Sequence, residues 1–350
     1  MKTRFFWDHQ DVFNNYVSRH PLGDLLQTTF WGRLKQSSDW DYYPLAALKN
    51  GVIEGTALLL SKRISVLPAC LFYSPRGPLF SSPQAFKALC TAGRKLAAEK
   101  GALVWKMDPA IAAKDPLWPQ LALAQKLLPV STGLDFSGVQ PRFEMILDIK
   151  ARPKQLLKNM KSKTRYNIRY SQRKEVRAFP VDRQEDLSIF YSLLEETSQR
   201  DGFMIRPFSY FQALWEHLIA NNAAQLFLAY HQKTPLAGAI VFRLGTKVWY
   251  VYGASSYENR RLQAPHLIQW EIIKWAKGLG CHTYNFRGVS GDLNPDNPLY
   301  GLYRFKEGFG AELTEYVGEY DLALSRGGYA LWRRALAAHN WLRTKQRRLI

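Results

Sequence analysis

The hydrophobic and polar positions of this chain predict one order of elements that occurs twice. In the first half, apolar residues at helical spacing predict helices, and short apolar or alternating runs predict strands. The helices are expected at 12–18, 21–35 and 83–100, and the strands at 43–49, 54–64 and 103–107. Asn50-Gly51 separates the first two strands and is typical of a tight hairpin turn.

The second half repeats this order of helix, hairpin, helix and strand. Helices are expected at 186–198, 209–221 and 266–279, and strands at 225–231, 236–244, 247–253 and 282–286. An alternating strand at 315–322 would close a sheet. The fold class is therefore α/β, with α+β mixed sheets in two tandem acyltransferase-like (GNAT-like) domains. We expect a first domain at 1–148, which the tail could complete, a second at 149–325, and a basic helix at 326–350.

The composition fits a globular protein, since 47% of the residues are hydrophobic. No apolar run reaches the roughly 18 residues that a membrane span needs, and the N-terminus lacks a signal-peptide core. A cytoplasmic protein is expected. Three cysteines are widely spaced, and neither they nor the seven histidines show metal-ligand spacing, so we expect no metal.

The net charge of +19 is unevenly distributed. The segment 150–177 holds eleven Lys or Arg and one acid, and the tail from Arg326 holds seven and no acid. Such charge favours a polyanionic partner, namely nucleic acid, an anionic membrane face or a phosphorylated substrate. The candidate RNA contacts are Lys158, Lys161, Lys163 and Arg165. The alternative is a solvated helix face.

The segment 301–310 (GLYRFKEGFG) carries the most specific candidate chemistry. Lys306 lies with Phe305 and Phe309 among glycines, which let other backbones approach closely. A lysine in this setting can stabilise negative charge that develops during acyl transfer. The alternative is a surface lysine in a glycine turn.

This segment resembles the closing motif of the FemABX aminoacyltransferases, and the resemblance spans nearly the whole chain. Any one motif is weak, but together and in this order they are specific. The others are QTTFWGRLK at 27–35, FYSPRGP at 72–78, WKMDP at 105–109, KSKTRYNIR at 161–169 and FMIR at 203–206. No sustained heptads occur between 177 and 225, so the chain is similar to shorter, FemX-like members without a coiled-coil arm.

The resemblance implies transfer of Ala, Ser or Gly from aminoacyl-tRNA to the side-chain amine of the third stem residue of a peptidoglycan precursor. This would serve bridge or branch formation, and with it cell-wall biogenesis and cell shape. The precursor would be UDP-linked or lipid II, no cofactor would be needed, and a monomer is expected. The basic tail would contact the anionic inner face of the cell membrane.

The resemblance also implies roles for individual residues. Lys35 and Arg206 would bind the precursor diphosphate, although Lys35 could also be a solvated helix-end cation. Arg76 would line the acceptor groove or simply form a turn. Tyr210 and Tyr252 would line the cleft, although tyrosines at such positions are more often core.

The resemblance gives roles to three further residues. Asp108 would orient the acceptor amine or accept its proton, or else cap the following helix. Lys306 would be catalytic, and Phe305 would stack on the acceptor end of the tRNA.

Two other functions remain open on the sequence. One is an RNA-binding protein on a non-catalytic acyltransferase scaffold, which would show a steep salt dependence of RNA affinity and no transfer. The other is an acyl-CoA N-acyltransferase. The strand-to-helix segment 258–266 disfavours it, because this segment offers Arg260 and Arg261 but no glycine-rich pyrophosphate loop.

Overall fold

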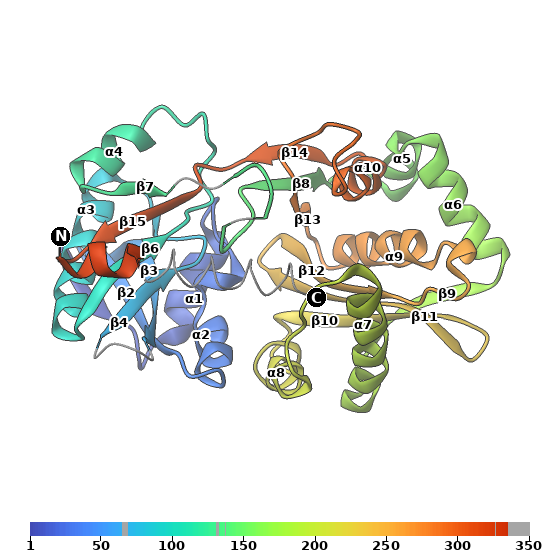
Figure 1. Ribbon diagram of the computed structural model, residues 1–350, viewed down its shortest axis with the longest axis horizontal. Coiled ribbons are helices and arrows are strands. Elements are labelled where there is room, and N and C mark those ends of the chain that lie inside the picture. Colours follow the sequence, from blue (N-terminus) through green and yellow to red (C-terminus); the bar gives the residue numbers. More distant parts are fainter. Residues whose placement is uncertain (65–68, 131–132, 137, 326, 335–350) are drawn as a thin grey trace. The chain divides into compact units, whose positions relative to one another are not determined.

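The computed structural model describes residues 1–350 except 65–68, 131–132, 137, 326 and 335–350. The described chain forms two compact units, each built on its own mixed sheet (Figure 1). Unit 1 holds residues 1–22, 26–131 and the described residues from 317 onward. Unit 2 holds residues 23–25 and 132–316. The expectation of two mixed α/β units is confirmed.

The boundaries differ from those expected. The first lies at 131–132 rather than 148–149, because strand β8 (Phe143–Asp148) pairs with β13 (Thr283–Val289) and β14 (Glu312–Glu315) of unit 2. The chain returns to unit 1 at 317, earlier than the expected 325. Residues 327–334 are helical, and the rest of the expected C-terminal helix lies outside the described residues.

The sheet of unit 1 has the strand order β1-β2-β3-β4-β6-β15-β7, and β5 also pairs with β3. Its hairpin β2–β3 turns at the expected Asn50 and Gly51, both at positive φ. The strands are β1 (Lys2–Phe5), β2 (Asp41–Lys49), β3 (Val52–Arg63), β4 (Cys70–Ser74), β5 (Leu79–Phe80), β6 (Ala102–Met107), β7 (Leu128–Val130) and β15 (Glu319–Ala323).

Helices lie on both faces of this sheet. On one face, α3 buries Phe86 and Leu89 against a core that includes Phe72 and Trp105. On the other face, Trp31 of α2 packs against Leu58 and Tyr73. The helices are α1 (Gln10–Arg19), α2 (Thr29–Gln36), α3 (Pro83–Glu99) and α4 (Trp118–Ala124), with a short 3-10 turn at Leu25–Gln27.

The sheet of unit 2 has the order β14-β8-β13-β12-β11-β10-β9. Figure 1 shows α9 and α7 on opposite faces of its central strands, where α9 contacts β9 to β12 and α7 contacts β11 and β12. The strands not yet given are β9 (Val176–Val181), β10 (Ala224–His231), β11 (Thr234–Leu244) and β12 (Lys247–Ser255). The helices are α5 (Pro153–Asn159), α6 (Ser162–Arg173), α7 (Leu187–Asp201), α8 (Phe208–Leu214, continued by a π-helical turn at Trp215–Ile219), α9 (Ala264–Gly278) and α10 (Tyr300–Glu307).

Two segments differ from their predicted elements. The helix expected at 21–35 begins only at Thr29, after the Thr28 side chain accepts a hydrogen bond from the backbone N–H of Trp31. The strand expected at 315–322 is two strands separated by Gly318, whose φ is +82°. The first of them, β14, ends the sheet of unit 2, and the second, β15, lies in the sheet of unit 1.

Candidate active site

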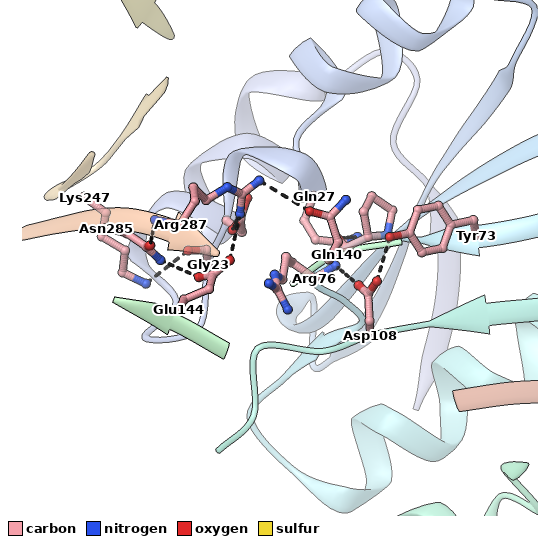
Figure 2. Close-up of polar contacts among 12 residues, drawn as sticks. Gly23, Gln27, Tyr73, Arg76, Asp108, Gln140, Glu144, Lys247, Asn285 and Arg287 are labelled. Carbon is pink, nitrogen blue, oxygen red and sulfur yellow. Dashed lines mark hydrogen bonds and ion pairs between the residues drawn. The ribbon is translucent and has the colours of Figure 1, made fainter. Parts of the chain in front are cut away.

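Asp108 is the centre of a buried polar cluster in unit 1. It follows β6, as the sequence predicted, and is 2% exposed. Its Oδ2 accepts a hydrogen bond from the Tyr73 hydroxyl at 2.6 Å, and its Oδ1 accepts one from the backbone N–H of Arg76 at 2.6 Å. Figure 2 shows Tyr73 and the Arg76 backbone directed at the two carboxylate oxygens.

The burial of Asp108 raises the pKa of its carboxyl group to about 7, although the Arg76 charge and the two hydrogen bonds oppose the shift. The charge of Glu319 raises this pKa further. The Lys106 amine lies 2.7 Å from Glu319 Oε2 and 3.1 Å from Asp321 Oδ1. A carboxyl group that titrates near neutrality can both hold and release a proton under physiological conditions.

Two early motifs meet around Asp108. Gln27 donates its amide to the carbonyl of Pro75 at 2.7 Å and accepts from the N–H of Leu58 at 3.1 Å. A Cβ on Gly77 would lie 2.3 Å from the Gln27 amide, so glycine is needed for this approach. Arg76 is 2% exposed, and its backbone lies at a φ of +55°, which is uncommon for arginine.

Lys35 is also buried in unit 1, at 8% exposure, near the end of α2. Its amine lies 5.2 Å from the ring centre of Trp40 and 5.7 Å from that of Trp31. These rings attract the cation through their π-faces. Lys35 is therefore not a solvated helix-end cation but a buried one that lies near two tryptophan rings.

Lys306 is the centre of a second buried cluster, which lies in unit 2. It occupies the last turn of α10 rather than a glycine turn, is 4% exposed and donates to the carbonyl of Gly288 at 2.6 Å. Burial lowers the pKa of its amine to about 7; the Glu144 charge opposes this shift and the Arg287 charge adds to it. The surface-lysine alternative is therefore wrong.

An irregular stretch of β13 places the neighbours of Lys306. The pairing of β13 with β8 shifts between Asn285 and Gly288, and Arg287 lies at a φ of +62°, which is uncommon for arginine. Asn285 donates to Glu144 at 2.6 Å, and the Arg287 guanidinium lies 3.4 Å from Glu144 (Figure 2). The same guanidinium lies 3.7 Å from Asp24. Glu144 is 1% exposed and acts as the anionic partner of this cluster.

Tyr210 and Tyr252 meet in unit 2 as a hydrogen-bonded pair. The Tyr252 hydroxyl donates to that of Tyr210 at 3.2 Å, and burial raises the pKa of both phenols. The Arg206 guanidinium lies over the Tyr210 ring at 5.6 Å, and its side chain is exposed. The charges of Arg206 and Arg287 both lower the pKa of Tyr252 and so oppose the larger effect of its burial.

Phe305 lines a separate cavity of about 300 Å³ in unit 2. Its ring packs edge-on against His266 at 5.0 Å. The cavity lies at the start of α9, where backbone N–H groups are unpaired within the helix, and it also offers Arg200 and Arg260. Its walls combine an aromatic face with cations.

The structure separates the four candidate RNA contacts into two kinds. Lys161 pairs with Glu307 at 2.5 Å, and Arg165 donates to the carbonyls of Lys158 and Met160 at the end of α5. These two side chains therefore hold α5, α6 and α10 together. Lys158 and Lys163 are exposed. The sequence could not distinguish the two kinds, because the spacing of charges along a helix does not reveal their partners.

Several functional candidates escaped the sequence analysis. They are polar or aromatic residues inside otherwise apolar strands or in quoted motifs, namely Tyr73, Glu144, Asn285, Arg287 and Glu319. The available signal was a single acid or amide among apolar residues of a buried strand, as Glu144 in FEMIL at 143–147. Within the described residues, no group of three His, Cys, Asp or Glu side chains could hold a metal ion, and no helix has the length and apolarity to cross a bilayer.

The two mixed sheets and the helices on their faces form a tandem GNAT-like fold. A tandem GNAT protein of clavulanic acid biosynthesis shares this fold, with a TM-score of 0.54 and 12% identity over 93% of this chain and 99% of that one. The chain belongs to the FemAB family, whose sequence model matches residues 9–120, 129–232 and 219–336.

Two relatives cover nearly the whole chain. The crystal structure of FemX has a TM-score of 0.87 and 27% identity over 95% of this chain and 99% of its own. The lipid II:glycine glycyltransferase of Staphylococcus aureus (strain USA300) is 29% identical over 90% of this chain and 92% of its own length. That alignment runs over 387 positions, more than the 350 residues here, so the relative contains insertions that this chain lacks.

Proposed function

We propose that this protein moves an amino acid (Ala, Ser or Gly) from aminoacyl-tRNA to the side-chain amine of the third stem residue of a peptidoglycan precursor. The observation that carries the proposal is the buried Lys306 amine, with a pKa near neutrality, in a chain of the FemAB family. The relative named for lipid II and glycine supports a precursor of this kind as the acceptor.

The proposed reaction is aminolysis of an ester. The acceptor amine attacks the ester carbonyl carbon, a C–N bond forms, and the carbonyl oxygen becomes an oxyanion. The Lys306 ammonium stabilises that oxyanion, an effect worth about 3 kcal/mol for one well-placed donor. The C–O bond to the ribose then breaks, the ribose oxygen takes up a proton, and the new amide nitrogen loses one. Because the ester is already activated, positioning and charge stabilisation suffice.

Asp108 is the proposed acceptor of the amine proton. Both of its oxygens are held by neutral donors, Tyr73 and the backbone of Arg76, which fix the carboxyl group without removing its basicity. A pKa of about 7 is well matched to this task, because the base is then strong enough to take a proton and is still ionised in part.

The donor is proposed to bind along the outer face of α6. Tyr166 and Tyr170 stack there at 5.8 Å, and Arg173 and Lys174 each lie 5.9 Å from one of the two rings. Together with Lys163 and Arg169, this face alternates aromatic rings with cations, which suits a ribose-phosphate backbone. The Phe305 cavity would take the terminal nucleoside.

We expect Lys163→Gln, Arg169→Gln and Arg173→Gln together to weaken tRNA binding and to flatten its salt dependence. Each lost phosphate contact reduces the slope of log affinity against log salt by about one unit or less. The control replaces three exposed lysines at Lys87, Lys95 and Lys100 of unit 1. Titrations of tRNA at several salt concentrations compare the variants. Equal slopes of log affinity against log salt for both triple variants would show that tRNA does not bind along α6.

Lys35 and Arg206 are proposed to contact the diphosphate of the precursor. We expect Lys35→Ala and Arg206→Ala each to raise the KM for the precursor more than they lower kcat, because phosphate contacts are made equally in the bound and transition states. Two contacts with one diphosphate should also be coupled in a double-mutant cycle. Fully additive effects, or an unchanged KM, would exclude a shared phosphate site.

The identity of the donor separates this function from its two rivals. Purified protein is incubated with a precursor and one of three donors: intact labelled aminoacyl-tRNA, the same tRNA after ribonuclease treatment, or labelled acyl-CoA. We expect label in the precursor only with intact aminoacyl-tRNA. Label from acyl-CoA would indicate a CoA-dependent acyltransferase. Binding of tRNA without any transfer would indicate a non-catalytic RNA-binding protein.

A further inference from the structure

Three leucines in and beside helix α4 are exposed to solvent: Leu117 just before it, Leu123 within it and Leu128 at the start of β7. The side chains of Leu123, Leu117 and Leu128 are 79%, 59% and 42% exposed. Single apolar residues are ordinary on a protein surface, whereas these three large ones lie within about a dozen residues of one another around one helix. We call Leu117, Leu123 and Leu128 the α4 leucines.

The α4 leucines are held outward by a rigid base. The opposite face of α4 buries Trp118, which is 1% exposed and packs edge-on against Tyr320 at 5.1 Å. Asp115 Oδ1 accepts from the backbone N–H groups of Leu117 and Trp118 at 2.9 and 3.0 Å, which fixes the start of the helix. The helix therefore cannot turn these leucines inward without unpacking the tryptophan.

The charges around the α4 leucines are positive. Lys114 and Lys126 stand exposed at the two ends of the segment, and the Arg94 guanidinium donates to the carbonyl of Gln125. The one acid between 114 and 128 is Asp115, whose Oδ1 already accepts from the backbone N–H groups of Leu117 and Trp118. Exposed leucines bordered by lysines match the surface of an anionic bilayer, because leucines can enter its apolar layer while lysines contact the lipid phosphates.

We propose that the α4 leucines dock unit 1 on an anionic lipid bilayer. Leu117 and Leu123 enter the head-group region, and Lys114 and Lys126 face lipid phosphates. The docking itself is argued from the α4 leucines and their lysines. Its biological use rests on the proposed function, since a lipid-linked acceptor lies in such a surface. It involves residues other than the basic tail, which lies largely outside the described residues.

Sedimentation with vesicles tests the docking directly, with the full chain and without substrates. Wild type should bind vesicles of phosphatidylcholine with phosphatidylglycerol more tightly than phosphatidylcholine alone. The Leu117→Gln, Leu123→Gln variant should lose about tenfold in partitioning on the anionic vesicles. The Lys114→Gln, Lys126→Gln variant should bind anionic vesicles only about as tightly as it binds neutral ones. Val52→Gln, at an apolar residue 67% exposed on the β2–β3 hairpin, is the matched control and should bind like wild type.

Three outcomes would overturn the docking: no vesicle binding by wild type, equal binding by the leucine variant, or loss in the Val52 control as large as in the leucine variant. Self-association that the leucine substitutions abolish, with vesicle binding unchanged, would assign this face to a second copy of the chain. Circular dichroism of the variants must match wild type, because Leu117 and Leu123 are too exposed to be needed for folding.

A transfer assay separates this inference from the proposed function. The leucine variant should transfer less to a lipid-linked precursor in vesicles than wild type, and equally to a water-soluble, UDP-linked precursor. Vesicle binding by a wild-type protein that transfers to neither precursor would refute the proposed function and leave the docking standing. Transfer to the soluble precursor without vesicle binding would refute the docking alone.

Discussion

Replacing Lys306 by methionine is expected to lower kcat by about a hundredfold or more, while the affinities for tRNA and precursor change little. The lysine stabilises charge that exists only in the transition state, so its loss should not weaken ground-state binding. The size follows from the roughly 3 kcal/mol that one oxyanion donor supplies in a site without water. Single-turnover rates and separate binding titrations measure the two effects.

The control for this prediction is Lys277→Met. Lys277 also donates its amine to backbone carbonyls in unit 2, at Ile149 and Lys150, but it lies outside the site. The Lys277→Met variant should have a kcat within about threefold of wild type. The same result for Lys306→Met would refute the catalytic assignment.

The rate should also depend on pH through Lys306. Its pKa is lowered from the ordinary 10.5 to about 7, so the ammonium form is lost as the pH rises through about 7, and kcat/KM should fall there. Lys306→Arg keeps a positive charge at every pH of the assay, so this falling limb should disappear in that variant. A falling limb that persists in the arginine variant belongs to another group.

Replacing Asp108 by asparagine is the second large effect that we expect. As the proposed proton acceptor, Asp108 should contribute about a hundredfold to kcat, within the usual range for general-base catalysis. Its pKa is raised from 3.8 to about 7, so the carboxylate forms as the pH rises through about 7, which gives the rate a rising limb. Together with Lys306 this predicts a bell-shaped profile with a maximum near neutrality. The asparagine variant should lose the rising limb.

A structural role for Asp108 would give a different result. Asparagine can still accept from the backbone of Arg76, so thermal stability should change by only a few degrees if catalysis is the main role. Asp186→Asn, which alters another buried carboxylate, is the control and should leave kcat unchanged. A strongly lowered melting temperature with kcat within about threefold of wild type would make Asp108 a structural residue.

The fold could be predicted from the sequence where local signals agree with it. The hairpin at Asn50-Gly51, helix α3 ended near Gly101, and helix α9 each carry their own turn or periodicity. The domain boundary could not be predicted, because the partners of β8, namely β13 and β14, lie more than 130 residues further along the chain. Strand pairing of this range leaves no local signature.

The site was predictable to the extent that motifs marked it. Asp108 and Lys306 were found through their neighbours in sequence, but their near-neutral pKa values arise mainly from burial, which depends on parts of the chain that are distant in sequence. Lys161 and Arg165 looked like free cations, yet tertiary contacts with Glu307 and with the end of α5 engage them. Charge in a sequence is visible, whereas its pairing is a property of the fold.

Mass spectrometry of the reaction product tests the central claim most directly. The protein is incubated with glycyl-, alanyl- or seryl-tRNA and a precursor, and the precursor is then fragmented. The account predicts a mass gain of one amino acid residue, located on the side-chain amine of the third stem residue, that is lost in Lys306→Met. An unmodified precursor with all three donors, or a gain that the lysine variant retains in full, would contradict it.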